Sequence, residues 1–447
     1  MFYRNILSEL EAWKTSTGRK PLILRGARQV GKTTIVNLFS SQYKQYIYLN
    51  LERKEEAEPF RNFIRFDTLV ETIFFIKDQN IQERDTLLFI DEIQAVPEAI
   101  NLLRYFYEDY PWLHVIAAGS LLETIMREEV SVPVGRVEYK VMRPVTFSEF
   151  LAALGEEAAL KQLTTVPVQE FAHEKLLYLF HRYTLIGGMP EVVQNYALNQ
   201  NMTALLPIYE SLQESFLNDV EKYARNNKLV YVIRHVIKSM SFEAGNRIKF
   251  QHFGQSNYGS KEVGEALRII EKAMLLNLVY PTTNVILPIL PDRRKSPRLH
   301  LLDTGLMNFV AGLQKDLISL NDLHSLYQGK IAEQIVGQEI LATKFNVMNE
   351  LHFWVREKPN STAEVDFVTM FDGKMIPIEV KSGETGRLRS LHLFMDQCTH
   401  QTALRLYSGK LKKDVVRTQE GKEYTLLSLP YYLAGQIDQY LTWLDRH

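Results

Sequence analysis

The sequence predicts an α/β protein with an N-terminal domain built on a parallel sheet, a mostly helical middle and a second α/β domain at the C-terminus. Three observations predict this fold class. Short apolar runs alternate with helical segments up to about residue 150, which is typical of a parallel sheet covered on both faces. A glycine-rich turn, residues 26–33, follows the first apolar run. Charged and apolar residues alternate over residues 351–381, which is typical of half-buried strands.

Length and composition limit the possible classes of protein. A chain of 447 residues is expected to form several domains, at roughly 150 residues each. Hydrophobic content of 46% and charged content of 23% are ordinary for a folded globular protein. The 52 Lys and Arg residues balance 53 Asp and Glu residues, which excludes an overall basic field, so any contact with nucleic acid must use a local patch.

The single cysteine and the lack of long apolar runs indicate a cytoplasmic protein. Cys398 cannot form an internal disulfide or a cysteine-rich zinc site, which fits a reducing compartment. Residues 1–14 mix charged with apolar residues, unlike a secretory signal. No run approaches the roughly 18 apolar residues of a membrane span, so we expect no membrane contact.

The glycine-rich turn predicts a triphosphate site in the first domain, residues 1–150. It reads G-x-x-x-x-G-K-T and lies between the apolar strand Leu22–Leu24 and a helical segment. The glycines let backbone amides and the helix N-terminus face phosphate, Lys32 reaches the β- and γ-phosphates, and the Thr33 hydroxyl binds Mg²⁺. The expected nucleotide-binding residues of this turn are Gly26, Ala27, Arg28, Gln29, Val30, Gly31, Lys32, Thr33 and Thr34.

Two further strands bring polar residues to the same edge of the sheet. The strand Leu87–Ile90 leads into Asp91 and Glu92, at the carboxyl end where open parallel sheets bind ligands. Asp91 would complete the magnesium shell, and Glu92 would act as general base on the attacking water. The strand His114–Ala118 leads to Ser120, a candidate sensor of the γ-phosphate. Taken alone, Asp91 and Glu92 are explained equally well by a solvated strand end, but with the glycine-rich turn they become the expected other half of the site. A simple turn explains Ser120 about as well as a sensor does.

The middle of the chain is predicted to contain two domains. Residues 151–227 are interpreted as a helical lid and connector, interrupted at Gly187 and Gly188. Residues 228–310 contain two or three helices and a short strand, Leu278–Tyr280, which is the make-up of a winged helix.

Charge on the candidate winged helix does not favour DNA. Apolar residues from Val263 to Leu278 recur every three or four positions, as on the buried side of one helix, and its acidic and basic residues balance. A denser basic patch follows on the chain, although runs of exposed charge are usually only solvated surface. This patch comprises Arg293, Arg294, Lys295 and Arg298.

The last domain, residues 311–447, is predicted to be α/β with carboxylates on its strands. Period-two geometry places Glu379 and Lys381 on one face, and Asp366 lies on the preceding strand. Oxygen ligands of this kind suit Mg²⁺, whereas half-exposed strands explain the same alternation without any site. The expected elements are a helix over Ile331–Leu341 and strands over Leu351–Val355, Glu364–Met370 and Met375–Lys381.

Several short stretches besides the glycine-rich turn carry a family resemblance. They are Gly119-Ser120, Val134-Gly135-Arg136 running to Pro144 and Ser148-Glu149-Phe150, Gly187-Gly188-Met189-Pro190, and Leu302-Asp303-Thr304-Gly305-Leu306. Over nearly its whole length the chain resembles bacterial and archaeal AAA-type P-loop ATPases that continue into a winged helix and a C-terminal domain of uncertain role. The resemblance implies ATP and Mg²⁺ as cofactors.

The resemblance also implies roles for single residues. Arg136 would contact the γ-phosphate of its own site or of a neighbouring subunit's site, although a surface salt bridge explains it equally well. The C-terminal domain would have the core of PD-(D/E)xK restriction-type nucleases, with Glu333, Asp366 and Glu379 around a metal ion and Lys381 near the nucleophilic water. Members of that superfamily lose catalysis and keep the fold.

The order of these motifs favours an ATPase whose nucleotide state moves the lid and winged helix and so controls a nuclease-like module acting on nucleic acid. The alternative is a regulatory switch of the STAND type, in which the last domain is a catalytically inactive interaction surface. Nucleotide-dependent regulation of transcription is a third hypothesis, disfavoured by the neutral net charge. The candidate partners are ATP, DNA and further copies of the chain.

Overall fold

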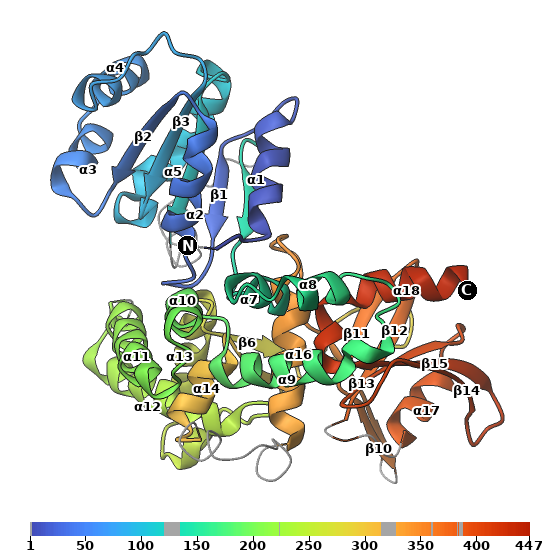
Figure 1. The fold of residues 1–447 in the computed structure, drawn as a ribbon. Coiled ribbons are helices and arrows are strands. Elements are labelled where there is room, and N and C mark those ends of the chain that lie inside the picture. The colour runs from blue at the N-terminus through green and yellow to red at the C-terminus, as the bar shows by residue number, and fades with distance from the viewer. Residues whose placement is uncertain are drawn as a thin grey trace.

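The computed structural model describes residues 2–119, 135–222, 224–313, 328–358, 361–381, 383 and 388–447. In Figure 1 the elements before residue 142 form one lobe, and the rest of the chain forms a second, larger lobe beneath it. Within the described ranges, none of the helices has the length and apolar character needed to cross a bilayer.

A five-stranded sheet forms the centre of the first lobe, and all its neighbouring strands run parallel. The strand order is β2-β3-β4-β1-β5. The predicted parallel sheet is therefore confirmed. The strands are β1 Leu22–Arg25, β2 Gln45–Asn50, β3 Thr86–Asp91, β4 His114–Gly119 and β5 Glu138–Val141.

Helices cover both faces of this sheet, which explains why the three central strands β3, β4 and β1 are buried and mostly apolar. Two helices, α1 and α2, pack on the face that carries Leu22 and Leu24, and three, α3 to α5, pack on the face that carries Ile23. The helices are α1 Ile6–Thr15, α2 Lys32–Phe39, α3 Lys54–Arg61, α4 Phe66–Ile76 and α5 Pro97–Asp109.

Five helices begin the second lobe. The first of them starts with a capping box, in which the Thr146 hydroxyl accepts from the Glu149 amide and the Glu149 carboxylate accepts from the Thr146 amide. The predicted break at Gly187 and Gly188 separates the third helix from the fourth. The helices are α7 Phe147–Ala153, α8 Glu157–Leu163, α9 His173–Ile186, α10 Pro190–Asn199 and α11 Leu206–Glu221.

Two helices and an antiparallel strand pair follow, β6 with β8. The sequence predicts one buried helix face that extends to Leu278, and this prediction is wrong. Helix α13 ends at Lys272, Met274 adopts a left-handed backbone conformation, and Leu278 lies in β6. The elements are α12 Asn227–Glu243, α13 Ser260–Lys272, β6 Leu276–Val279, β7 Pro281–Thr282, β8 Arg298–Leu301 and α14 Thr304–Val310.

The C-terminal part is a mixed α/β structure with two sheets, ordered β11-β12-β13-β15-β14 and β10-β9-β7. Strand β7, from the predicted winged-helix segment, pairs in parallel with β9. The elements are α16 Gln328–Ala342, β9 Phe353–Lys358, β10 Ser361–Val365, β11 Phe367–Phe371, β12 Lys374–Val380, α17 Arg389–Met395, β13 Thr402–Tyr407, β14 Lys412–Arg417, β15 Glu423–Pro430 and α18 Ile437–Arg446.

The predicted single strand Glu364–Met370 is wrong, because the chain bends at Asp366 and divides it between the two sheets. One carboxylate oxygen of Asp366 accepts a hydrogen bond from the Val380 amide at 2.8 Å. This contact fixes the bend against β12, so Glu364 in β10 and Phe367 in β11 belong to different sheets.

A buried carboxylate joins α16 to the helices that follow the first lobe. Glu339 Oε1 accepts hydrogen bonds from the Phe147 amide at 3.0 Å and from the Tyr183 hydroxyl at 2.7 Å. Burial raises the pKa of Glu339 to about 7. Because the folded protein favours the protonated acid, this group stabilises the fold most below its ordinary pKa, and the contribution is lost as the pH rises through about 7.

Glu339→Gln keeps the accepting oxygen and removes the titration. We expect the variant to be more stable than the wild type at pH 8, by up to about 3 kcal/mol, and to differ little at pH 4.5. Thermal melts of both proteins between these pH values measure the difference. Glu420→Gln, at an exposed loop position, should give a constant difference. A constant difference for Glu339→Gln as well would contradict the raised pKa.

Candidate functional site

The glycine-rich turn joins β1 to α2 at the carboxyl edge of the parallel sheet. Gly26 and Gly31 both have positive φ angles, and a Cβ on Gly26 would overlap the carbonyl oxygen of Met142, so only glycine fits there. Helix α2 starts directly after Gly31, and no side chain caps its first amides. These uncapped N–H groups and the helix dipole form a suitable site for an anion.

Lys32 is the buried cation of this turn. Its ammonium donates to the carbonyl oxygens of Gly26 and Ala27, both at 2.9 Å, and the residue is only 7% exposed. Burial lowers the pKa of Lys32 to about 8, although Glu92 and Asp91 act in the opposite direction. Phosphate oxygens would give this ammonium charged acceptors in place of two carbonyls.

Asp91 and Thr33 meet at the end of β3. The Thr33 hydroxyl donates to Asp91 Oδ2 at 2.6 Å, and the Tyr48 hydroxyl donates to the same oxygen at 3.3 Å. Asp91 is 3% exposed, and burial raises the pKa of its carboxyl group. A hydroxyl and a carboxylate side by side fit the oxygen ligands that Mg²⁺ prefers.

Glu92 follows Asp91 in a backbone conformation that is costly for a residue with a side chain. Its φ is +50°, its amide donates to Asp91 Oδ1 at 3.1 Å, and its carboxylate accepts from the Gln94 amide group. Strained backbone of this kind is concentrated at functional sites. The sharp turn leaves Glu92 at the same sheet edge as Asp91.

Of the other predicted residues, the structure places Arg136 away from this site. Ser120 lies outside the described residues, and Thr34 is exposed on α2. Arg136 precedes the start of β5, where Glu138 pairs with Leu22, so Arg136 lies at the sheet edge opposite the glycine-rich turn. Its side chain is 48% exposed and bonds to Glu108 at 2.7 Å. Arg136 is therefore remote from the nucleotide site of its own chain.

Two side chains of the turn contact helix α11 in the second lobe. Arg28 Nη1 donates to Asp219 Oδ1 at 2.6 Å, and Gln29 Nε2 donates to the Ser215 hydroxyl at 3.3 Å. The sequence predicts that Arg28 and Gln29 bind the nucleotide and gives no sign of these contacts. No local signal could have found them, because their partners lie 191 and 186 residues further along the chain.

Arg4 was also missed by the sequence analysis. Its guanidinium donates to the carbonyl oxygens of Val30 at 3.2 Å and Arg143 at 2.7 Å, and it pairs with Glu149 at 3.0 Å. One buried arginine therefore ties the glycine-rich turn to the beginning of the second lobe. This gives a structural role to the Ser148-Glu149-Phe150 stretch.

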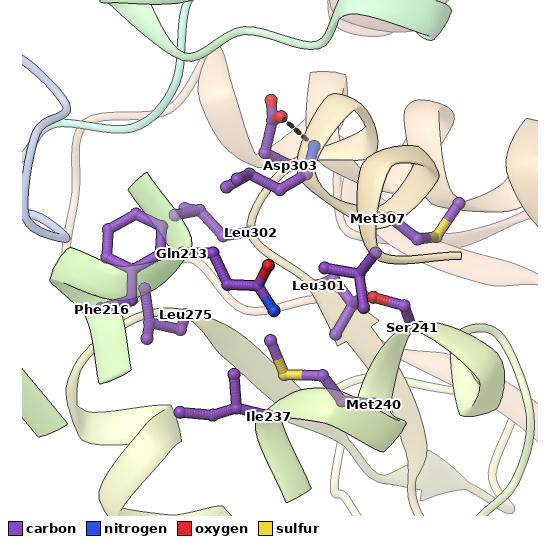
Figure 2. A pocket seen from close by; sticks show the side chains of 12 residues that line it. Gln213, Phe216, Ile237, Met240, Ser241, Leu275, Leu301, Leu302, Asp303 and Met307 are labelled. Atoms are coloured by element: carbon purple, nitrogen blue, oxygen red, sulfur yellow. Dashed lines mark hydrogen bonds between the residues drawn. The ribbon is translucent and has the colours of Figure 1, made fainter. Parts of the chain in front are cut away.

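The other two stretches of the family resemblance meet at Asp303. Its carboxylate accepts from the Gly188 amide at 2.5 Å and from the Leu306 amide at 3.0 Å, the second bond capping α14. Burial raises the pKa of Asp303 to about 6. Figure 2 shows this capping bond at the rim of a small apolar pocket between α11, α12 and α14, into which Gln213 of α11 projects.

The predicted C-terminal site residues gather around a cation from another segment. We call Glu333, Glu364, Asp366 and Glu379 the acidic cluster. Arg298 of β8 donates to Glu333 Oε2 at 3.2 Å and Asp366 Oδ1 at 3.4 Å, and it also pairs with Glu364. Lys381 pairs with Glu379 at 2.5 Å.

The sequence predicts Arg298 in an exposed basic patch, and this prediction is wrong because Arg298 is largely buried. Its side chain is only 12% exposed and stacks on the Phe353 ring at 4.8 Å. Burial lowers its pKa, but the surrounding carboxylates outweigh burial and raise it above the usual value. Burial and Asp366 also raise the pKa of Glu333 to about 8 and that of Glu379 to about 7.

The acidic cluster does not fit a divalent metal in this arrangement. Among the described residues, no three His, Cys, Asp or Glu side chains are grouped as a metal site. The Arg298 guanidinium takes the oxygens of Glu333 and Asp366 that a metal ion would need. Two of the expected magnesium ligands, Glu333 and Asp366, therefore meet on an organic cation, while Glu379 pairs with Lys381.

Three protein-family models match successive parts of the chain. An AAA domain matches residues 18–151, and domains of unknown function (DUF8612 and DUF4143) match residues 177–317 and 328–432. No curated protein matches the chain. With the fold and the glycine-rich turn, the first match identifies residues 18–151 as an AAA-type P-loop domain, a domain type that binds ATP.

Several solved structures are similar to the chain at low identity. The Walker-type ATPase PABY2304 of Pyrococcus abyssi is 15% identical, covers 70% of this chain and 96% of its own, and has a TM-score of 0.45. The RuvB Holliday junction branch migration motor of Thermotoga maritima is 13% identical over 62% and 90%, with a TM-score of 0.29. The Orc1 protein of Aeropyrum pernix, in complex with DNA, is 12% identical over 71% and 93%, with a TM-score of 0.24.

Proposed function

We propose that the chain is an ATP-hydrolysing regulatory switch, in which the nucleotide state of the P-loop sets the position of the second lobe. One observation carries the proposal: the turn that would hold the phosphates also holds α11, through Arg28 and Asp219. Binding at the backbone of this turn would therefore act directly on a helix of the other lobe.

The described residues support specific roles in hydrolysis. The first amides of α2 and the ammonium of Lys32 would hold the β- and γ-phosphates. Thr33 and Asp91 would hold Mg²⁺, which when bound supplies positive charge against the phosphates. Glu92 would accept a proton from the attacking water. Lys32 would exchange its two carbonyl acceptors for phosphate oxygens, which loosens the inside of the turn next to Arg28.

Helix α11 is suited to receive this signal. It carries Ser215 and Asp219, which contact the turn, and Gln213 and Phe216, which line the apolar pocket. The pocket lies where α11 faces α12 and α14 (Figure 2), so a shift of α11 would change the contacts of its lining residues. Asp303 caps α14, and β8 precedes α14 in the chain. A shift of α14 would therefore also move Asp303 and β8.

Arg136 supports a proposal that the switch works as an oligomer. The side chain is exposed and remote from its own P-loop, and its ion pair with Glu108 is a surface pair of small expected strength. An exposed arginine of this kind is available to the γ-phosphate of a neighbouring copy. Ser120 remains our candidate for the sensor within the same chain.

Glu92→Gln tests the hydrolytic role. The amide keeps the size and the contact to Gln94 but cannot take a proton, so we expect steady-state ATP hydrolysis to fall at least about 100-fold while ATP binding is kept. Release of phosphate and binding of a fluorescent ATP analogue measure the two properties. Glu55→Gln, at an exposed position on α3, is the matched control and should hydrolyse normally.

The same variant tests the signal to the second lobe. With ATP and Mg²⁺ added, we expect hydrogen exchange within 206–221 to change in Glu92→Gln and to remain changed, because the nucleotide is not consumed. Normal hydrolysis by Glu92→Gln would refute the general-base assignment. Unchanged exchange in α11 despite saturated binding would refute the switch.

A second candidate is the control of a nuclease-like module acting on DNA. The convergence of Glu333, Asp366, Glu379 and Lys381 supports it, as do α12, α13 and the β6–β8 pair, which have the order of a winged helix. The Arg298 guanidinium within the acidic cluster counts against it. Cleavage of DNA in Mg²⁺ by the wild type, abolished by Asp366→Asn, would establish this candidate in place of the inactive interaction domain.

A further inference from the structure

The acidic cluster already contains a positive charge, which pairs with most of its carboxylates. Arg298 Nη1 contacts Glu333 Oε2 at 3.2 Å and the Asp366 carbonyl oxygen at 3.3 Å, while Nη2 contacts Glu364 and, at 3.4 Å, Asp366 Oδ1. Three acids of the cluster therefore share one guanidinium. A buried guanidinium with several carboxylate partners is held far more firmly than an exposed ion pair.

The strand that supplies Arg298 is fixed to the helix that supplies Glu333. Gln334 on α16 accepts from the Leu301 amide at 3.0 Å and donates to the Leu301 carbonyl at 2.7 Å. The next turn repeats the pattern, because the Thr304 amide donates to Gln338 at 2.9 Å. The backbone that carries Arg298 is therefore held beside the acidic cluster while β8 and α16 keep this register.

The guanidinium and a divalent ion compete for the same oxygens. A Mg²⁺ or Mn²⁺ ion needs unshared carboxylate oxygens within about 2.0–2.6 Å, and it is repelled by a cation among them. Glu379 is 5% exposed, and its Oε2 has no hydrogen-bond partner in the described part of the chain. This oxygen and those released from Arg298 would surround the space that the guanidinium fills.

We propose that Arg298 is the resident cation of the acidic cluster and excludes divalent metal ions from it. Removing the guanidinium would convert Glu333, Asp366 and Glu379 into a site for Mg²⁺ or Mn²⁺. The inference deepens the proposed function at one point, the inactive interaction domain, and is independent of ATP hydrolysis.

Binding of Mn²⁺ to the full-length, nucleotide-free chain tests the proposal, with free Mn²⁺ measured by electron paramagnetic resonance. We expect Arg298→Ala to bind one Mn²⁺ at least about tenfold more tightly than any site of the wild type. The double variant Arg298→Ala/Asp366→Asn should lose that site, which separates it from weak binding at Asp91. Arg298→Lys should exclude the ion as the wild type does.

Arg247→Ala is the matched control. Arg247 is another arginine near the acidic cluster. It lies 2.5 Å from Glu357 and 4.0 Å from Glu364, but no contact joins it to Glu333 or Asp366. Its removal should create no Mn²⁺ site, which distinguishes the position of Arg298 from a general gain in negative charge.

Two results would overturn the proposal. The first is Mn²⁺ binding by the wild type that Asp366→Asn removes, and this comparison does not depend on the folding of any Arg298 variant. The second is a folded Arg298→Ala that binds no more Mn²⁺ than the wild type. If Arg298→Ala does not fold, Arg298→Gln replaces it, because the amide fills part of the space without a positive charge. A normal ATPase rate in these variants would show that the proposed ATPase switch does not depend on the role of Arg298.

Discussion

Lys32→Ala is expected to abolish saturable binding of ATP and, with it, all hydrolysis. The ammonium is the buried cationic group of the P-loop itself, beside the uncapped start of α2, and its loss removes the strongest attraction for the β- and γ-phosphates. We expect the apparent affinity for a fluorescent ATP analogue in Mg²⁺ to fall at least about 100-fold, equivalent to about 2.7 kcal/mol.

The variant should still fold, since Lys32 donates only to the carbonyl oxygens of Gly26 and Ala27. Thermal melting in the absence of nucleotide checks this point. Lys44→Ala, at an exposed position before β2, is the matched lysine control and should bind ATP normally. Wild-type affinity in a folded Lys32→Ala protein would mean that the phosphates bind elsewhere.

Gly305→Ala is expected to have the largest effect on stability. A Cβ on Gly305 would overlap the carbonyl oxygen of Ile186, at the point where α14 meets the end of α9. The nearest atoms are backbone atoms of Ile186 and Gly187, so no flexible side chain can move away and the two segments must separate. We expect a loss of about 3 kcal/mol or more, visible as a lower melting temperature or as insoluble protein.

Gly329→Ala controls for the substitution itself. Nothing lies within 4 Å of a Cβ at Gly329, which is part of α16, so alanine there should be neutral or slightly stabilising. Equal melting temperatures for Gly305→Ala and the wild type would contradict the close approach of α9 and α14.

The features that the sequence predicted well are those carried by neighbouring residues. The apolar strand Leu22–Arg25, the turn to Lys32 and the strand before Asp91 each depend on a short window, in which burial on both faces or a need for glycine is visible directly. The P-loop could therefore be located from the sequence alone.

The features that the sequence missed depend on distant partners. Arg298 was read as exposed because three basic residues precede it closely, and only the fold brings it against Glu333 and Asp366. Arg28 was assigned to the nucleotide by its place in the turn, while its side chain pairs with Asp219. Local periodicity also could not reveal the bend at Asp366, since it is set by the amide of β12.

The pairing of β7 with β9 has a consequence for how this protein can be divided. A fragment starting at residue 311 would lack both β7 and β8, leaving one side of β9 with open hydrogen-bonding groups and the acidic cluster without its guanidinium. Open strand edges recruit other chains, and crowded bare carboxylates repel one another. Truncation there should give a self-associating polypeptide, whereas a cut before α12 would keep the shared sheet whole.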